Sequence, residues 1–304
     1  MRLFKEPLAR LVTAKTAKFY AVLSTLLVLG AAVFSLKEPA YAENRQADVL
    51  SIGGSVTEII YALGQEHRLV ARDVTSTYPT AALDLPSVGY IRALSPEGVL
   101  SVNPDMIISE EGAGPPEALS VLKEAAIPFI EIPDGFDANT VSAKIKAVGA
   151  ALEVEAEADV LAADIHARIA AATARAHDLT DTPKRVMFVL STQGGRVMAA
   201  GTDTSADAII SLSGGINAIE GISGYKPISD EAIGLAAPEI IVMMDRRGDH
   251  AASDAEFWAM PAIKLTPAAE TKSIVRMDGL LLLGFGPRVA DAIEELSNAI
   301  YGGT

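Results

Sequence analysis

A tyrosine and an arginine two residues apart, Tyr90 and Arg92, are the side chains in this sequence best suited to bind a metal centre. They lie in the stretch GYIRALSPEG, in a polar segment that precedes a predicted short helix. A cation close to a phenol favours the phenolate, which is a better metal ligand than the neutral phenol. The alternative is an aromatic side chain at the rim of a loop, packed on Pro86. The pair predicts a binding site in this loop.

Other candidate contacts lie in loops expected at the ends of strands. Arg288 follows GFGP and is expected to open the last helix, where backbone N–H groups favour an anion; the alternative is a surface ion pair. Arg246 follows the strand-like EIIVMMD, and Gln193 lies in LSTQGGRVMAAG. Tyr225 follows a glycine, as Tyr90 does, and is expected to line the same site from the second half of the chain.

Two glutamates, Glu97 and Glu231, stand near the starts of two predicted helices. An acidic side chain in the first turn stabilises a helix by roughly 0.3–1 kcal/mol through the helix dipole. That effect alone would explain both residues.

Catalytic and bare-metal chemistry have little support in the sequence. His166 and His177 fall on a predicted long helix, His67 lies at a turn, and only His250 is in a strand-end loop. A zinc or manganese carrier needs several ligands that converge on the metal. The sequence has no phosphate-binding loop, dinucleotide fingerprint or nucleophile elbow, so we do not expect an enzyme.

The elements that must position these residues alternate between strand and helix. ADVLSIGGSVTEIIYALG reads as a strand, a glycine turn and a helix, in which Ser55 and Glu58 have the spacing of a capping box. Further strand and helix patterns follow, which predicts parallel sheets with crossover helices. Residues 138–178 are rich in alanine and lack proline, which predicts a long helix with one break near GAALEVEAEA.

The second half of the chain repeats the first. LSPEGVLSVNPDMII aligns with ISDEAIGLAAPEIIV at a constant offset, so that Ser95, Glu97 and Pro104 match Ser229, Glu231 and Pro238. SVTEIIYALG is echoed by SADAIISLSG in the same order. We interpret this as two similar lobes, although the limited ways of capping βα units could produce some likeness.

Composition and the N-terminus indicate an exported protein. The chain has 304 residues, no cysteine and a net charge of −14. Six basic and two acidic side chains lie in the first 42 residues, so the remainder carries −18 and is poorly suited to bind nucleic acid. The apolar run from Ala21 to Leu36 precedes an A-x-A site, which predicts a signal peptide cleaved after Ala42; the alternative is an uncleaved anchor. A periplasmic protein without a lipid anchor fits best.

The motifs GYIRALSPEGVLSVNPDMII, MAAGTDTSADAIISLSGG, GYKPIS and LLLGFGPR resemble the periplasmic haem-binding proteins of bacterial ABC importers. These belong to a larger group of substrate-binding proteins with a helical backbone, which also serves vitamin B12 and ferric siderophores. The resemblance implies an α/β fold with two similar lobes, each a mostly parallel sheet flanked by helices. One long α-helix would join the lobes, and the ligand cleft would lie between them.

Residue by residue, the resemblance implies that Tyr90 is the axial ligand of haem iron, a role that tyrosinate is known to fill. Arg92 and Arg288 would contact the propionates, with Tyr225, Gln193 and Arg246 as further cleft contacts. Some relatives carry a histidine near Gln193, and its absence here puts a doubly loaded site in doubt. Glu97 and Glu231 would dock onto arginines of the membrane permease.

The expected organisation is a signal peptide (1–42), an N-terminal lobe (47–137), a connecting helix (138–178) and a C-terminal lobe (184–302). The expected ligand is haem b as cargo. Its partners would be an inner-membrane permease with its ATPase and an outer-membrane haem receptor upstream. Two alternatives stay open: a carrier for a ferric siderophore or corrinoid, and a haem sensor or storage protein without a transporter.

Overall fold

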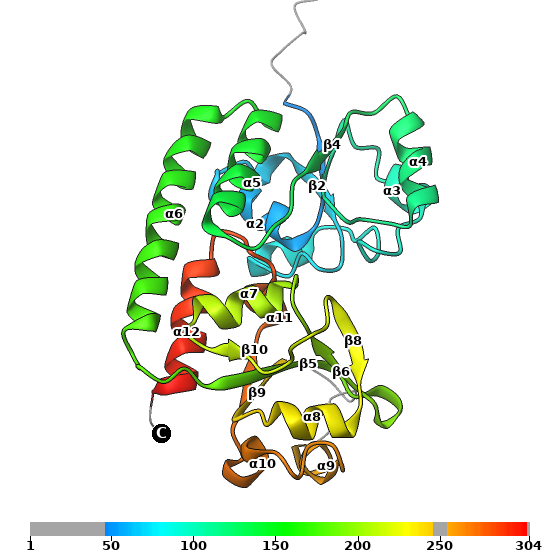
Figure 1. Cartoon of the computed structure of the whole chain (residues 1–304). Coiled ribbons are helices and arrows are strands. Elements are labelled where there is room, and N and C mark those ends of the chain that lie inside the picture. Colours follow the sequence, from blue (N-terminus) through cyan, green and yellow to red (C-terminus); the bar gives the residue numbers. More distant parts are fainter. Residues whose placement is uncertain (1–45, 246–253, 303–304) are drawn as a thin grey trace, which may run out of the picture. The chain divides into compact units, whose positions relative to one another are not determined.

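The computed structural model describes residues 46–245 and 254–302, in which two β-sheets and their flanking helices form two α/β lobes (Figure 1). The predicted signal peptide and its cleavage site lie outside the described residues. Within the described part of the chain, no helix is both long and apolar enough to cross a membrane.

The N-terminal lobe is built on a parallel four-stranded sheet in the order β2-β1-β3-β4. All four residues of β1 are buried, as expected for a parallel strand covered on both faces. The elements of this lobe are β1 Val49–Ile52, α2 Gly54–Ala62, η1 Glu66–Arg68, β2 Leu69–Arg72, η2 Thr80–Asp84, α3 Pro96–Leu100, β3 Met106–Glu110, α4 Pro116–Glu124 and β4 Phe129–Ile132.

The C-terminal lobe contains a mixed six-stranded sheet in the order β10-β9-β5-β6-β8, with β7 beside β5. β6 pairs antiparallel with β5 on one side and with β8 on the other, and the other pairs are parallel. Its elements are β5 Arg185–Ser191, η3 Gln193–Gly195, β6 Val197–Ala200, α7 Ser205–Leu212, β7 Ile216–Asn217, β8 Tyr225–Ile228, α8 Asp230–Ala236, β9 Ile240–Met244, α9 Asp254–Ala259, α10 Pro267–Thr271, β10 Ile274–Met277, α11 Gly279–Leu283 and α12 Val289–Tyr301.

The two sheets share a topology, which confirms the predicted similarity of the lobes. The parallel order β7-β5-β9-β10 reproduces β2-β1-β3-β4, and each has helices between its strands. Ser95 caps α3 and Ser229 caps α8 in the same way, because each side chain accepts a hydrogen bond from a backbone N–H of the first turn. The difference is the antiparallel pair β6 and β8, which the C-terminal lobe adds at the edge of β5.

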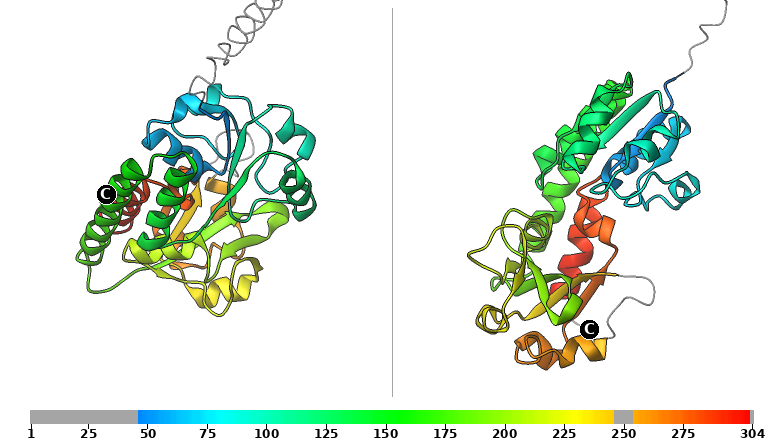
Figure 2. Two further views of the ribbon diagram at one scale, coloured as in Figure 1. Left: turned by 90° about the horizontal axis from the view of Figure 1, so that it is seen from above. Right: turned by 90° about the vertical axis from the view of Figure 1, so that its right-hand side faces the viewer.

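Two helices, α5 (Ala138–Ala151) and α6 (Glu155–His177), occupy the segment for which the sequence predicted one long helix with a break. The break falls at Leu152–Val154, where Glu153 has a φ of 60°. After this break, α6 packs back along α5. The two helices approach closely at Gly149, where a Cβ would lie 2.1 Å from Ala158. α6 is therefore the single long helix that runs from one lobe to the other (Figure 2).

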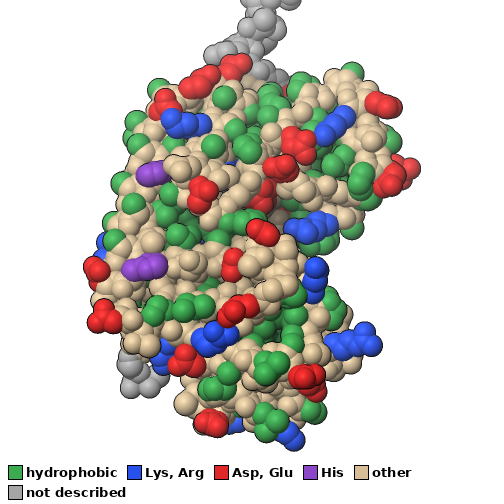
Figure 3. Space-filling model, in the orientation of Figure 1, with side chains coloured by type: hydrophobic (Ala, Val, Ile, Leu, Met, Phe, Trp, Pro, Cys, Tyr) green, Lys and Arg blue, Asp and Glu red, His purple; other side chains and the backbone are tan. Residues whose placement is uncertain are grey.

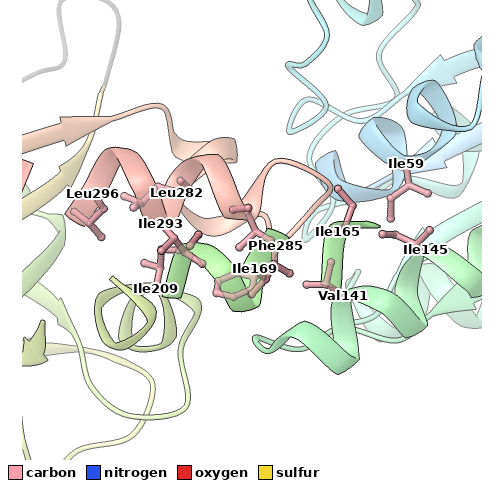
Figure 4. Packing of buried hydrophobic residues seen from close by; sticks show 14 of the residues in the cluster. Ile59, Val141, Ile145, Ile165, Ile169, Ile209, Leu282, Phe285, Ile293 and Leu296 are labelled. Atoms are coloured by element: carbon pink, nitrogen blue, oxygen red, sulfur yellow. The ribbon is translucent and has the colours of Figure 1, made fainter. Parts of the chain in front are cut away.

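One hydrophobic core extends through both lobes along α6. Ile165 and Ile169 of α6 pack in the same cluster as Ile59 of the N-terminal lobe and Ile293 of the C-terminal lobe (Figure 4). Small alanines on the same face of α6, including Ala158, Ala162 and Ala172, let its neighbours approach closely. Burial of this continuous apolar surface holds the lobes to the connecting helix.

Candidate functional site

Tyr90 lies in the long connection between β2 and α3, close to the carboxyl end of β2. Ligands of open parallel α/β sheets sit in the crevice outside the carboxyl ends of the strands. Tyr90 is 46% exposed, so a ligand can approach it from solution. Among the described residues no hydrogen bond to its hydroxyl is found.

Backbone hydrogen bonds hold the loop around Tyr90 on both sides; residues 87–94 are called the Tyr90 loop below. The amides of Val74 and Val88 donate to the carbonyls of Gly89 and Arg72, at 2.8 and 2.9 Å. On the far side, the amide of Leu94 donates to Gly114, and the amide of Gly114 donates to Ile91. The Tyr90 loop is thus a fixed platform, in which buried Val88, Ile91 and Leu94 alternate with exposed side chains.

Arg92 is exposed on the same loop and makes no ion pair or side-chain hydrogen bond within the described residues. Its charge is available to an anion in solution, in a protein body that is otherwise strongly acidic. The structure thus provides an accessible phenol and an accessible cation two residues apart. Their roles as iron ligand and propionate contact stay predictions.

Arg288 is the N-cap of α12, as the sequence predicted, but its guanidinium is engaged within the protein. Its Nε donates to Oε1 of Glu58 at 3.1 Å, and Nη2 donates to the same oxygen. Its Cζ lies 3.6 Å from the centre of the Tyr78 ring. Burial raises the pKa of Glu58, although the bond from Arg288 acts in the opposite direction. The propionate contact predicted for Arg288 stays a prediction.

The capping box predicted for Ser55 and Glu58 is wrong. Gly53 is the N-cap of α2 and provides no side-chain cap. Ser55 Oγ instead donates to Glu110 Oε1 at 2.5 Å, and Glu58 pairs with Arg288. Both side chains have partners far away in the sequence, which a local spacing rule cannot reveal.

A second buried charge lies beside the start of α2. Lys144 of α5 is fully buried, and its Nζ donates to Glu110 at 2.6 Å, to Asp134 at 2.7 Å and to Ser55 at 3.2 Å. Burial lowers the pKa of Lys144, but the charges of Glu110 and Asp134 outweigh it and the net shift is upward. Sequence analysis missed this cluster, because a lone lysine on a helix reads as a solvated side chain.

Tyr225 is the first residue of β8 and not a loop residue as predicted. Its hydroxyl lies 3.1 Å from Ser205 Oγ at the start of α7, and its ring meets Phe188 edge to face. These contacts fix Tyr225 within its own lobe. Gln193 is exposed in η3, the turn between β5 and β6, and Arg246 lies outside the described residues. Cleft contacts by all three stay predictions.

Glu97 and Glu231 are exposed at equivalent positions, each in the first turn of its helix. Neither carboxylate has an ion-pair partner among the described residues. The structure therefore leaves both free to meet another protein, one on each lobe.

The surface view shows an indentation between the two lobes, with basic side chains along its margin (Figure 3). Within the described residues, no group of three or more histidine, aspartate or glutamate side chains is placed to hold a metal ion. The accessible donor on the Tyr90 loop is a phenol, which suits an iron that already carries other ligands.

Comparison with known proteins identifies the fold family. A model of the periplasmic binding protein family matches residues 49–280, which is most of the chain. The chain belongs to the periplasmic binding protein family. Solved structures similar to this chain include the periplasmic heme-binding protein BhuT in complex with two hemes, at 36% identity and a TM-score of 0.79. That match covers 84% of this chain and 98% of BhuT.

Two further relatives are named for different ligands. The periplasmic heme-binding protein RhuT from Roseiflexus sp. RS-1, in its apo form, is 35% identical with a TM-score of 0.80, over 84% of this chain and 97% of RhuT. The vitamin B12-binding protein of Vibrio cholerae is 26% identical over 257 residues, or 82% of this chain and 87% of that protein. These relatives of the chain therefore differ in the ligand that their names state.

Proposed function

We propose that this protein is an exported substrate-binding protein that captures haem through the Tyr90 phenolate and delivers it to an inner-membrane ABC importer. The observation that carries the proposal is Tyr90 itself, an accessible phenol on a loop held by the backbone at both ends. Relatives named for heme at 35–36% identity support haem as the cargo. The predicted signal peptide and the family support a periplasmic location.

The chemistry of haem matches what the Tyr90 loop offers. Ferric iron carries positive charge, so it stabilises a phenolate on the oxygen that binds it. The propionates are anions, and Arg92 is an exposed and unpaired cation within the described residues. In an acidic protein body, such a local cation is needed to offset the repulsion of an anionic ligand.

Corrinoid binding is the second candidate, because a vitamin B12-binding protein is among the relatives. The discriminating experiment is a titration of the mature protein with hemin and, separately, with cyanocobalamin, followed by absorption and by isothermal calorimetry. We expect saturable binding of hemin at one protein equivalent or more and no heat with cyanocobalamin. Saturable binding of cyanocobalamin without binding of hemin would show that the protein is a corrinoid carrier and would overturn the proposal.

A further inference from the structure

The two lobes also meet directly, through side chains that do not belong to the connecting helix. Glu58 belongs to α2 of the N-terminal lobe, and Arg288 caps α12 of the C-terminal lobe, 230 residues later. The side chain of Glu58 is 4% exposed and that of Arg288 is 22% exposed. Tyr78 of the N-terminal lobe covers the guanidinium from another side. One arginine of the C-terminal lobe is thus held by two separate parts of the N-terminal lobe.

Two glycines allow the backbones of the lobes to approach at this point. A Cβ on Gly54 would lie 2.4 Å from Leu280 of α11, and a Cβ on Gly286 would lie 3.1 Å from Oε2 of Glu58. A Cβ on Gly54 would also lie 2.8 Å from the backbone carbonyl of Thr75, so this close approach is suited to glycine. The ion pair therefore sits inside a closely fitted contact.

An aromatic pair completes the contact beside the core. Phe136, which precedes α5, meets Phe285 edge to face with 5.4 Å between the ring centres. Phe285 is 1% exposed and has a φ of 47°, which is unfavourable for a residue with a Cβ. Figure 4 shows its ring within the core cluster, near Ile169 of α6. Its packing must compensate for this backbone conformation.

The contact is linked by hydrogen bonds to the loop that carries Tyr90. Buried Asp73 accepts from the amide of Gly53, next to α2, and from Thr75 and Ser76 in the loop that leads to Tyr78. The amide of Val74 in that loop donates to Gly89, the neighbour of Tyr90. The position of the C-terminal lobe is in this way connected to the position of the Tyr90 loop.

We propose that Glu58, Arg288 and Tyr78 form an interlobe clasp that sets the spacing between the C-terminal lobe and the Tyr90 loop. The clasp acts through position and does not itself bind the iron. The consequence for the ligand rests on the proposed function, but the clasp itself is a property of the unliganded protein. Because guanidinium–carboxylate pairing is directional and the stacking fixes a second axis, the three groups resist both translation and rotation.

The clasp can be tested by the distance between the lobes. Because the chain contains no cysteine, cysteines introduced at the exposed positions Ser120 in α4 and Ala232 in α8 can be spin-labelled without background. Pulsed electron resonance should give one narrow distance peak for this labelled protein without ligand. Glu58→Gln, Arg288→Gln and Tyr78→Leu should each replace the narrow peak by a broad distribution.

The matched control removes an exposed ion pair that joins α6 to α12, the helix that Arg288 caps. Arg168 of α6 pairs with Asp291 of α12 at 2.6 Å, with both side chains 44% or more exposed. Arg168→Gln should leave the narrow peak unchanged. The double variant E58Q/R288Q leaves no uncompensated buried charge, so it keeps the test valid if either single variant fails to fold. Its peak should be broad as well, and an unchanged narrow peak in the folded double variant would overturn the clasp.

A second readout separates the clasp from a direct contact of Arg288 with ligand. If the clasp positions the site, Glu58→Gln and Arg288→Gln should both speed the release of hemin to an excess of apomyoglobin. The absorption spectrum of the bound hemin should stay unchanged, because Tyr90 is intact. Faster release in Arg288→Gln alone, with narrow peaks in both variants, would make Arg288 a ligand contact and overturn the clasp. If the parent protein binds no hemin, the proposed function fails and the distance measurement still decides the clasp.

Discussion

Lys144 places a full positive charge in the interior, where Glu110, Asp134 and Ser55 surround it. Removal of one member of a buried ion pair typically costs about 3–5 kcal/mol, because the remaining charge keeps its desolvation penalty. We therefore expect Lys144→Met to lower the free energy of unfolding by about that amount. Urea denaturation followed by circular dichroism measures it.

Lys123 offers the control for this variant. It pairs with Glu131 at 3.0 Å, but both side chains are more than 40% exposed. Such pairs are worth about 0–1 kcal/mol, so Lys123→Met should change stability little. Equal losses in the two variants would show that the burial of Lys144 is not what matters.

Asp137 caps α5 by accepting from the backbone N–H of Thr140 at 2.8 Å. This bond lowers the pKa of Asp137 below its ordinary value of 3.8. A carboxylate with a lowered pKa contributes stability that is present above the unfolded value and lost as the pH falls through the folded one. Asp137→Ala should thus cost about 1 kcal/mol at pH 7.

The same variant gives a test of the pH dependence. The difference in stability between parent and Asp137→Ala should shrink as the pH falls below about 3.8, because the unfolded state then takes up a proton at a higher pH than the folded state does. Thermal unfolding at pH 7 and at pH 3 measures both differences. A difference that stays constant or grows toward pH 3 would contradict the capping role.

Sequence patterns predicted the starts of helices well, because the deciding contacts are local. Ser95 and Ser229, which the repeat placed at equivalent helix starts, each accept from the backbone N–H of the residue three positions later. Glu58 was assigned to a local capping box, but its true partner is 230 residues away. No spacing rule contains that information, because only the folded arrangement brings α2 and α12 together.

At the scale of elements, α3 and α8 present the same feature from two lobes, an exposed glutamate in the first turn after a serine cap. If these helices dock onto a permease, the variant E97A/E231A should bind hemin as tightly as the parent but transfer it more slowly. The loss should be larger at low salt, where surface charge pairs count most. Hemin uptake into proteoliposomes that contain the importer measures transfer.

The matched control is Glu117, an acidic side chain in the first turn of α4. Glu117→Ala changes the same kind of helix start without touching α3 or α8, so transfer should stay normal. Normal transfer by E97A/E231A would leave both glutamates as helix-stabilising side chains. Loss of hemin binding in that variant would also contradict the docking role.

The order of strands and helices could be predicted because each element buries an apolar pattern of its own period. The helix break at Leu152–Val154 could also be predicted, near a glycine and a run of acidic residues. The antiparallel β6 and β8 could not, because Tyr225–Ile228 contains a proline and two exposed residues and reads as a loop. Its partner β6 supplies the hydrogen bonds that make it a strand.

At the scale of the whole molecule, α6 and the contact between Glu58 and Arg288 both oppose motion of the lobes. Bending α6 would break consecutive backbone hydrogen bonds, and its core face is packed against both lobes. We expect the radius of gyration from X-ray solution scattering to change little between the free and the hemin-loaded protein. A contraction typical of hinge-bending binding proteins would contradict this expectation.

The central claim, that the Tyr90 phenolate binds haem iron, is tested most directly by the absorption spectrum of the hemin complex. The parent protein should show the Soret and charge-transfer bands of a tyrosinate-ligated ferric haem. As a control, Tyr225→Phe removes a tyrosine hydroxyl from the C-terminal lobe, and this variant should keep these bands. Tyr90→Phe should lose them and bind hemin far more weakly while its circular dichroism stays that of the folded parent. A Tyr90→Phe complex with the spectrum of the parent would contradict the claim.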